Sequence, residues 1–253
     1  MGNRGYNFNP GPAVLPEEVL LEAKESIYCY AETGVGILEI SHRAPAFEKI
    51  VNEAKANVKE LLGAGDDFDV LFLQGGASLQ FYMVPLNLTQ GKVPAYINSG
   101  SWSQKAIKEA KRIGKVNVVA SSEEQKFSLI PEVKEDQIPK DSPYLHFTSN
   151  NTIFGTEFKK EPPSNGVGLV CDASSDFLSR PVDIKRYGLI YAGAQKNVGP
   201  AGVVIVVIHK DWIKKSDENL CPMLSYAIHA ANNSLYNTPS VFSIYISNLV
   251  IKW

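Results

Sequence analysis

One lysine in the second half of the chain stands out because its surroundings are so apolar. Lys196 is the only charged residue between Arg186 and His209, and it lies between apolar runs at 189–192 and 203–208. Desolvation lowers the pKa of an amine, and such a lysine at the end of a strand is a candidate nucleophile for Schiff-base formation. The alternative is a loop lysine whose ammonium group reaches solvent. The local sequence leaves both interpretations open.

A glycine-rich turn and a tryptophan follow two of the earlier apolar runs. The turn at 74–78 (Gln-Gly-Gly-Ala-Ser) leads into a helix-like segment. Free backbone N–H groups at the start of a helix suit a phosphate. The turn has neither the Walker A nor the G-x-G-x-x-G pattern, so it does not indicate a nucleotide. Trp102 could stack on a flat ligand or be an ordinary core residue.

Two further polar residues occupy equivalent positions after later apolar runs. Thr152 lies in the polar turn 149–155, which either offers a hydroxyl group to a ligand or bonds only its own backbone. Asp172 directly follows the run 168–171. A carboxylate at the end of a buried strand needs a partner, and the alternative role for Asp172 is to cap the next helix.

The elements that must position these residues are seven short apolar runs separated by helical or polar segments. Continuous apolar runs that alternate with helices predict an α/β fold: a mostly parallel seven-stranded sheet with helices on both faces, in three α/β/α layers. In such sheets ligands bind beyond the carboxyl ends of the strands. The expected strands are 70–73, 95–98, 116–120, 144–148, 168–171, 189–192 and 203–208.

These strand ends together offer a phosphate-binding turn, an aromatic ring, a hydroxyl, a carboxylate and a desolvated lysine. Pyridoxal phosphate has a phosphate, a flat ring, a phenolic oxygen, a ring nitrogen that an acid keeps protonated, and an aldehyde that a lysine captures. The combination therefore predicts pyridoxal phosphate as the cofactor.

Composition excludes several other classes of protein. The chain has 253 residues, of which 44% are hydrophobic, and a formal net charge of −2. Neither a basic patch for nucleic acid nor an apolar stretch of about 20 residues for a membrane span is present. The three cysteines are isolated, which predicts no disulfide framework and no metal site. We expect a reducing, cytoplasmic location, with an organellar leader removed before this numbering as an open alternative.

Seven segments in order along the chain resemble the phosphoserine aminotransferases, which are class V, fold-type I enzymes. The resemblance implies a homodimer that uses pyridoxal phosphate to transfer an amino group between O-phospho-L-serine and 2-oxoglutarate, in L-serine biosynthesis. Both substrates are small molecules. The segments are 9–12 (Asn-Pro-Gly-Pro), 39–43 (Glu-Ile-Ser-His-Arg), 74–78, 100–102 (Gly-Ser-Trp), 172–175 (Asp-Ala-Ser-Ser), 193–202 (Gly-Ala-Gln-Lys-Asn-Val-Gly-Pro-Ala-Gly) and 236–239 (Tyr-Asn-Thr-Pro).

The same resemblance implies a role for each residue around the cofactor ring. Lys196 would bind the cofactor covalently and later move the proton. Asp172 would pair with the ring nitrogen, Trp102 would stack on the ring, and Thr152 would hydrogen-bond the phenolic oxygen.

Five residues are implied to hold the cofactor phosphate. Ala77 (through its backbone), Ser78 and Gln195 would do so within one subunit. Asn237 and Thr238 would reach the phosphate of the neighbouring subunit's cofactor, so the resemblance predicts a site completed by a second copy.

His42 and Arg43 are implied to bind the substrate, because an arginine suits carboxylate or phosphate groups. The resemblance divides the chain into an N-terminal arm, 1–15, that belongs with the small domain, and a cofactor-binding large domain, 16–253. It also predicts a C-terminal small domain, which this sequence lacks. Two alternatives stay open: a non-catalytic fragment that binds cofactor or dimerises, and a related serine or alanine–glyoxylate aminotransferase.

Overall fold

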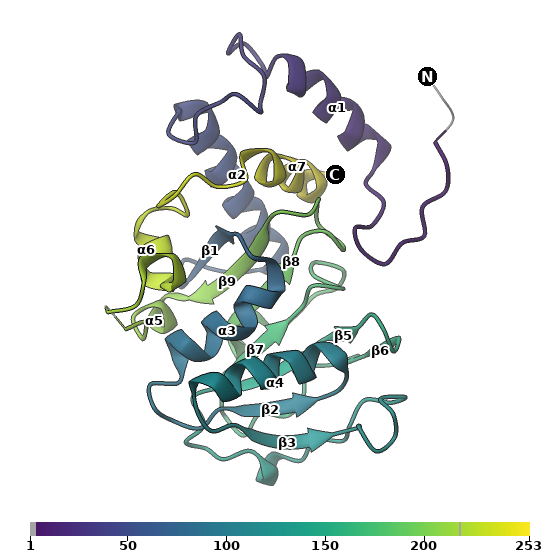
Figure 1. Cartoon of the computed structure of the whole chain (residues 1–253), viewed down its shortest axis with the longest axis vertical. Coiled ribbons are helices and arrows are strands. Elements are labelled where there is room, and N and C mark those ends of the chain that lie inside the picture. Colours follow the sequence, from purple (N-terminus) through teal and green to yellow (C-terminus); the bar gives the residue numbers. More distant parts are fainter. Residues whose placement is uncertain (1–3, 218) are drawn as a thin grey trace.

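A computed structural model describes residues 4–217 and 219–253, and its centre is a seven-stranded sheet (Figure 1). The strand order is β1-β9-β8-β7-β4-β2-β3. β9 runs antiparallel to β1 and β8, and the other neighbours in the sheet run parallel. The strands are β1 (Phe68–Leu73), β2 (Ala95–Asn98), β3 (Asn117–Ser121), β4 (Leu145–Thr148), β7 (Leu169–Asp172), β8 (Tyr187–Gly193) and β9 (Val204–His209).

Helices cover both faces of this sheet because its strands are apolar on both sides. Along β1, Val70 and Phe72 face one hydrophobic core, whereas Leu71 and Leu73 face the other, as the two-residue period of a strand requires. The first core is covered by α1 (Glu17–Tyr28), α2 (Pro45–Leu62) and α7 (Val241–Lys252). The second is covered by α3 (Gly76–Leu88), α4 (Ser101–Ile113), α5 (Lys210–Ile213) and α6 (Tyr226–Ala231).

The predicted α/β/α architecture with seven mostly parallel strands is therefore confirmed, with small shifts at the strand ends. The run predicted at 168–171 is β7, which includes Asp172 as its last residue. The polar turn predicted at 149–155 contains a short hairpin, β5 (Asn150–Asn151) paired with β6 (Thr156–Glu157). Three short 3-10 helices complete the elements: Glu135–Gln137, Ile184–Arg186 and Pro222–Leu224.

Residues 4–16, before α1, have no regular structure and run past the turn that carries Lys196. The N–H of Ala13 donates a hydrogen bond of 2.8 Å to the carbonyl oxygen of Gln195. A Cβ at Gly11 would lie 3.1 Å from Cγ of Lys196, so the arm backbone packs directly on the lysine stem. In Figure 1 the arm passes near the end of α7, and residues 13–16 line a groove with Val250 and Trp253.

None of the helices in the described residues has the length and apolar character that a membrane crossing requires.

Trp212 on α5 packs flat against the sheet because two neighbouring strands present glycine beneath it. A Cβ at Gly188 on β8 would lie 2.2 Å from the indole ring, and one at Gly168, just before β7, 2.5 Å from it. Gly188→Ala should therefore lower the free energy of unfolding by roughly 1–3 kcal/mol, the usual effect of overpacking. Chemical denaturation of the ligand-free chain measures this.

Gly114→Ala is the matched control, because Gly114 has extended backbone and nothing within 4 Å of its Cβ position. We expect a change within about 0.5 kcal/mol there. Equal stability of the two variants would show that the packing of Trp212 does not require a glycine at position 188.

Candidate active site

The glycine-rich turn joins the end of β1 to the start of α3 and leaves helix N–H groups free. Gly75 and Gly76 have φ values of 83° and 60°, a region that favours glycine. A Cβ on Gly75 would also lie 2.6 Å from Cβ of Leu79. The first N–H groups of a helix have no partner within that helix, so Gly76, Ala77 and Ser78 present donors together with the positive end of the helix dipole. The turn can hold a phosphate.

Asp172 ends β7 with its side chain buried, at 4% exposure. Its Oδ1 accepts two hydrogen bonds from Ser174, one from the backbone N–H (3.1 Å) and one from the hydroxyl (2.7 Å). Burial raises the pKa of Asp172, and the hydrogen bonds from Ser174 and the charge of Lys196 act in the opposite direction. No ion pair to this carboxylate is present among the described residues, so it is available to a cationic ligand.

Lys196 lies in the turn between β8 and β9, where it meets two hydroxyl groups. Its Nζ donates to Ser175 Oγ at 3.1 Å and contacts Thr152 Oγ1, and the two hydroxyls are 2.6 Å apart. Burial lowers the pKa of the Lys196 amine, and the charge of Asp172 opposes this effect. The lysine is therefore partly desolvated and does not simply extend into solvent.

These residues border one pocket of about 510 Å³ that opens to solvent. It contains six of the predicted cofactor-binding and catalytic residues, which come from α3, α4, β7 and the β8–β9 turn: Ala77, Ser78, Trp102, Asp172, Gln195 and Lys196. The Lys196 ammonium lies 5.3 Å from the centroid of the Trp102 ring. Thr152 is not among the residues that line the pocket, and its hydroxyl contacts the Lys196 amine.

The pocket also has unused polar groups that fit a flat, polar-rimmed molecule. The Nε1 of Trp102 and the Oγ1 of Thr148 are buried without a hydrogen-bond partner, and both residues line the pocket. A buried polar group without a partner is costly, so these atoms mark places where a ligand would complete the site. Together with the free carboxylate, the amine and the helix N-terminus, they fit pyridoxal phosphate.

The structure does not bring the other four predicted site residues into this pocket. His42 is buried with its Nε2 unpartnered, and Arg43 is exposed, in the loop before α2. Asn237 donates to the side chain of Gln74 at 3.1 Å, which places it beside the glycine-rich turn, and Thr238 next to it is exposed. Their predicted roles toward a substrate or a second subunit stay predictions.

Two serines that sequence reasoning gave no role hold the two charged groups of the site. Ser174 bonds Asp172, and Ser175 bonds Lys196. The only signal in the sequence was their place in the motif 172–175, which does not say which hydroxyl faces which charge.

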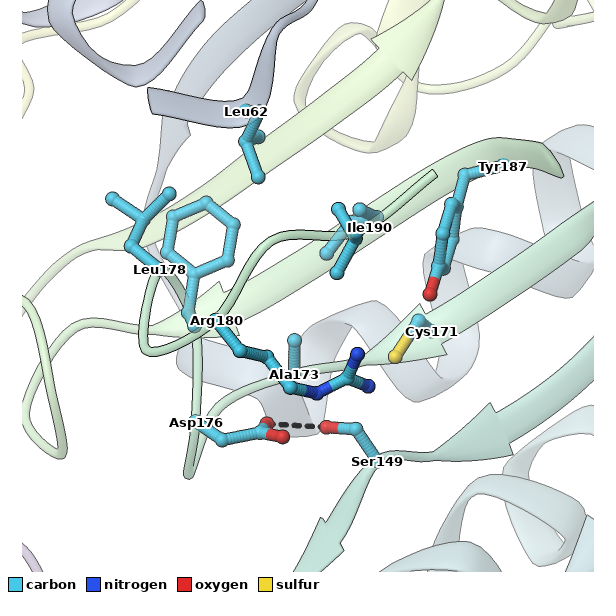
Figure 2. Close-up of a pocket in the computed structure, with 11 residues that line it drawn as sticks. Leu62, Ser149, Cys171, Ala173, Asp176, Leu178, Arg180, Tyr187 and Ile190 are labelled. Atoms are coloured by element: carbon cyan, nitrogen blue, oxygen red, sulfur yellow. Dashed lines mark hydrogen bonds between the residues drawn. The ribbon is translucent and has the colours of Figure 1, made fainter. Parts of the chain in front are cut away.

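A second pocket of about 340 Å³ lies on the opposite face of β7, and contacts among its lining residues hold the segment that follows β7 (Figure 2). Cys171 faces it, whereas Asp172, the next residue, faces the active-site pocket. The hydroxyl of Ser149 lies 3.1 Å from the carbonyl oxygen of Asp172 and also contacts the Asp176 carboxylate. Burial raises the pKa of Asp176. These contacts tie the end of β4 to the turn that follows β7.

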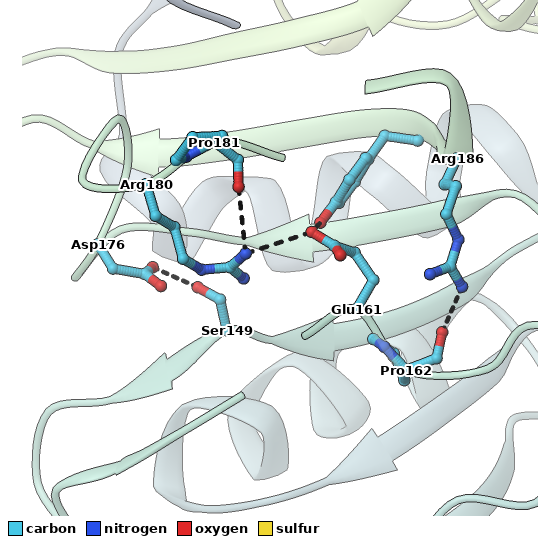
Figure 3. Close-up of polar contacts among 8 residues, drawn as sticks. Ser149, Glu161, Pro162, Asp176, Arg180, Pro181 and Arg186 are labelled. Carbon is cyan, nitrogen blue, oxygen red and sulfur yellow. Dashed lines mark hydrogen bonds and ion pairs between the residues drawn. The ribbon is translucent and has the colours of Figure 1, made fainter. Parts of the chain in front are cut away.

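Arginine side chains fix the neighbouring loops in the same region (Figure 3). Arg180 bonds Glu161 at 3.3 Å, and Tyr187 donates to the same carboxylate oxygen at 3.1 Å. Arg186 donates to the carbonyl oxygen of Pro162 at 2.5 Å. Because these contacts join the residues after β7 to β8 and to the segment after β6, they hold the segment that carries Ser174 and Ser175.

No group of three or more His, Cys, Asp or Glu residues within 4–217 and 219–253 is arranged to hold a metal ion. The cysteines at 29, 171 and 221 are free thiols.

Comparison with known proteins places this pocket in a family. Residues 5–253 match the family described as aminotransferase class-V. A phosphoserine aminotransferase from Desulfosudis oleivorans is 54% identical over 255 residues, which cover 100% of this chain and 70% of that protein. The solved phosphoserine aminotransferase of Bacillus circulans subsp. alkalophilus is 48% identical, with a TM-score of 0.94 over 99% of this chain and 70% of that one.

A second similar solved structure is a phosphoserine aminotransferase from Trichomonas vaginalis with PLP bound. It is 36% identical, has a TM-score of 0.92, and covers 99% of this chain and 75% of its own. The match extends over the glycine-rich turn, Asp172 and Lys196 because it spans nearly the whole chain. This chain belongs to the class-V aminotransferase family, and the relatives it resembles there are phosphoserine aminotransferases.

Proposed function

We propose that this chain binds pyridoxal phosphate through Lys196 and acts as a phosphoserine aminotransferase. The observation that carries the proposal is the convergence of the Lys196 amine, the Asp172 carboxylate and the Trp102 ring on one pocket beside the start of α3. Names of relatives at 48–54% identity support the choice of reaction.

Each wall of the pocket has a part in holding the cofactor. The N–H groups at Gly76–Ser78 and the dipole of α3 bind the phosphate, with Gln195 beside them. Trp102 would pack against the ring, and Asp172 would supply a negative charge to the ring nitrogen. When bound, pyridoxal phosphate supplies an electron sink for charge that develops on the substrate carbon.

Lys196 is the group that would hold the cofactor covalently, and its Nζ would accept and return the proton of the substrate carbon. Its lowered pKa keeps a larger fraction of the amine neutral, and only the neutral amine can act as nucleophile or base. The hydroxyls of Ser175 and Thr152 direct the nitrogen, and the Gly11 backbone limits the motion of its stem.

The substrate and the partner belong to this proposal as well. The relatives' name supports phosphoserine as amino donor, with 2-oxoglutarate as acceptor, and His42 and Arg43 as substrate-binding residues. Asn237 beside the glycine-rich turn and the exposed Thr238 support a homodimer in which these residues approach a phosphate in the second subunit. The free cysteines support a reducing, cytoplasmic location.

The reaction is tested by measuring amino transfer to 2-oxoglutarate from phosphoserine and, separately, from alanine. We expect kcat/KM to be at least about 100-fold higher for phosphoserine, because a site that binds a phosphate strongly rejects an analogue without one. Comparable rates with alanine would favour an alanine–glyoxylate type of enzyme. Absence of transfer despite covalent cofactor capture would favour a non-catalytic, cofactor-binding fragment.

Covalent capture is tested with Lys196→Ala. After incubation with pyridoxal phosphate and borohydride reduction, mass spectrometry should find the added mass on the peptide containing residue 196 in the parent chain and nowhere in the variant. Lys105→Ala is the matched control, because the Lys105 ammonium also lies near the Trp102 ring, 4.2 Å from its centroid, but outside the pocket. The control should retain full labelling. Undiminished labelling of the Lys196 variant would refute the assignment.

The buried carboxylate of Asp172 should lower the free energy of unfolding of the ligand-free chain in a pH-dependent way. Burial raises the folded-state pKa of Asp172, so ionising this carboxyl group costs more free energy in the folded than in the unfolded chain. This cost to folding is fully present once the pH exceeds the folded-state pKa. Asp172→Asn should therefore stabilise the ligand-free chain at pH 7 by roughly 0.5–2 kcal/mol. The gain should vanish below the unfolded-state pKa of about 3.9.

Urea unfolding of both chains between pH 4 and 8 measures this difference. The exposed Asp66→Asn serves as control and should show no such trend. A variant that is less stable than the parent at pH 7 would show that the carboxylate contributes to the fold itself.

A further inference from the structure

Ser174 occupies a position between the two strands that supply the charged groups of the site. Its hydroxyl accepts a hydrogen bond of 3.0 Å from the N–H of Gly193, the last residue of β8, and donates one of 2.7 Å to Oδ1 of Asp172 at the end of β7. Its own N–H also donates to Oδ1. Ser174 is 8% exposed, so water does not compete freely for these bonds.

The direction of the hydroxyl proton follows from these contacts. The Gly193 N–H can only donate, so it occupies a lone pair of Ser174 Oγ, and the single hydroxyl proton is left to point at Asp172. Two donors from Ser174 then converge on Oδ1. A proton carried by the carboxyl group must therefore lie on Oδ2.

The same contacts fix the orientation of the carboxylate. Rotation of the Asp172 side chain would break both bonds to Oδ1 at once, and Ser174 cannot follow because Gly193 holds it. Ser175 points its hydroxyl the other way, toward Lys196. The two adjacent serines thus act on different groups: Ser174 orients the Asp172 carboxylate, and Ser175 contacts the Lys196 amine.

We propose that Ser174 is a positioning residue for the reaction: by occupying Oδ1 and fixing the Asp172 side chain, it leaves Oδ2 as the oxygen that would pair with the protonated ring nitrogen of a bound cofactor. This inference rests on the proposed function, because it assumes that pyridoxal phosphate occupies the pocket. Within the described residues, the hydrogen bonds of the Ser174 side chain join it to Asp172 and to the backbone of β8.

The test is the affinity of the ligand-free chain for pyridoxal phosphate, measured by quenching of tryptophan fluorescence at several pH values. Ser174→Ala should weaken binding roughly 10- to 100-fold, the effect of removing a hydrogen bond to a charged group. On acidification, protonation of Asp172 weakens its hold on a protonated ring nitrogen. Loss of the hydroxyl donor raises the pKa of Asp172, so the decline in affinity should begin at higher pH in the variant.

Two further variants separate this role from a structural one. Ser174→Thr keeps the hydroxyl and should restore most of the affinity, provided that its unfolding midpoint matches that of the parent. In an Asp172→Asn background, Ser174→Ala should cost much less affinity, since the double-mutant cycle isolates the interaction between the two side chains. If the threonine variant is destabilised, the cycle alone decides.

The inference is overturned if Ser174→Ala binds within about twofold of the parent with an unchanged pH profile. It is equally overturned if the variant loses as much affinity in the Asp172→Asn background as in the parent. Failure of the proposed function is distinguishable, because the parent chain itself would then not capture pyridoxal phosphate at Lys196.

Discussion

The site depends on a carboxylate that the fold buries without an ion pair from any of the described residues. Asp172 ends a strand whose residues are all buried, and within the described residues the hydrogen bonds to its carboxylate come from Ser174. Such an arrangement is costly in the ligand-free chain. A cationic ring nitrogen would remove that cost, so the same desolvation that weakens the apoprotein strengthens its attraction for the cofactor. Lys196 is desolvated in the same pocket, which favours the neutral and reactive form of the amine.

The sheet explains how these groups come together. β7 and β8 run parallel, so Asp172 and the turn after Gly193 lie at the same edge, and the glycine-rich turn after β1 joins them there. β9 then returns antiparallel between β8 and β1. Because of this return, the connection around Lys196 is a short loop instead of a long crossover. Ser175, Thr152 and the N-terminal arm contact the lysine there.

The elements and most of the pocket could be predicted because their signals are local. Seven apolar runs predicted the strands to within a few residues, and a chemically suited group after five of these runs pointed to the ligand-binding edge. Partners of the polar groups could not be predicted in this way. Thr152 contacts the amine, 44 residues away in sequence, and Asn237 contacts Gln74, 163 residues away. Such pairings depend on how strands are ordered in the sheet.

By itself the sequence determined the fold class and the cofactor chemistry and identified Lys196 as the candidate nucleophile, because residue types and their order along the chain are properties of the sequence alone. Only the tertiary structure decided which serine serves which charge. Ser174 and Ser175 are chemically identical neighbours, and nothing local distinguishes them. Their hydroxyls take opposite roles because the turn after β7 presents one to Asp172 and Gly193 and the other to Lys196.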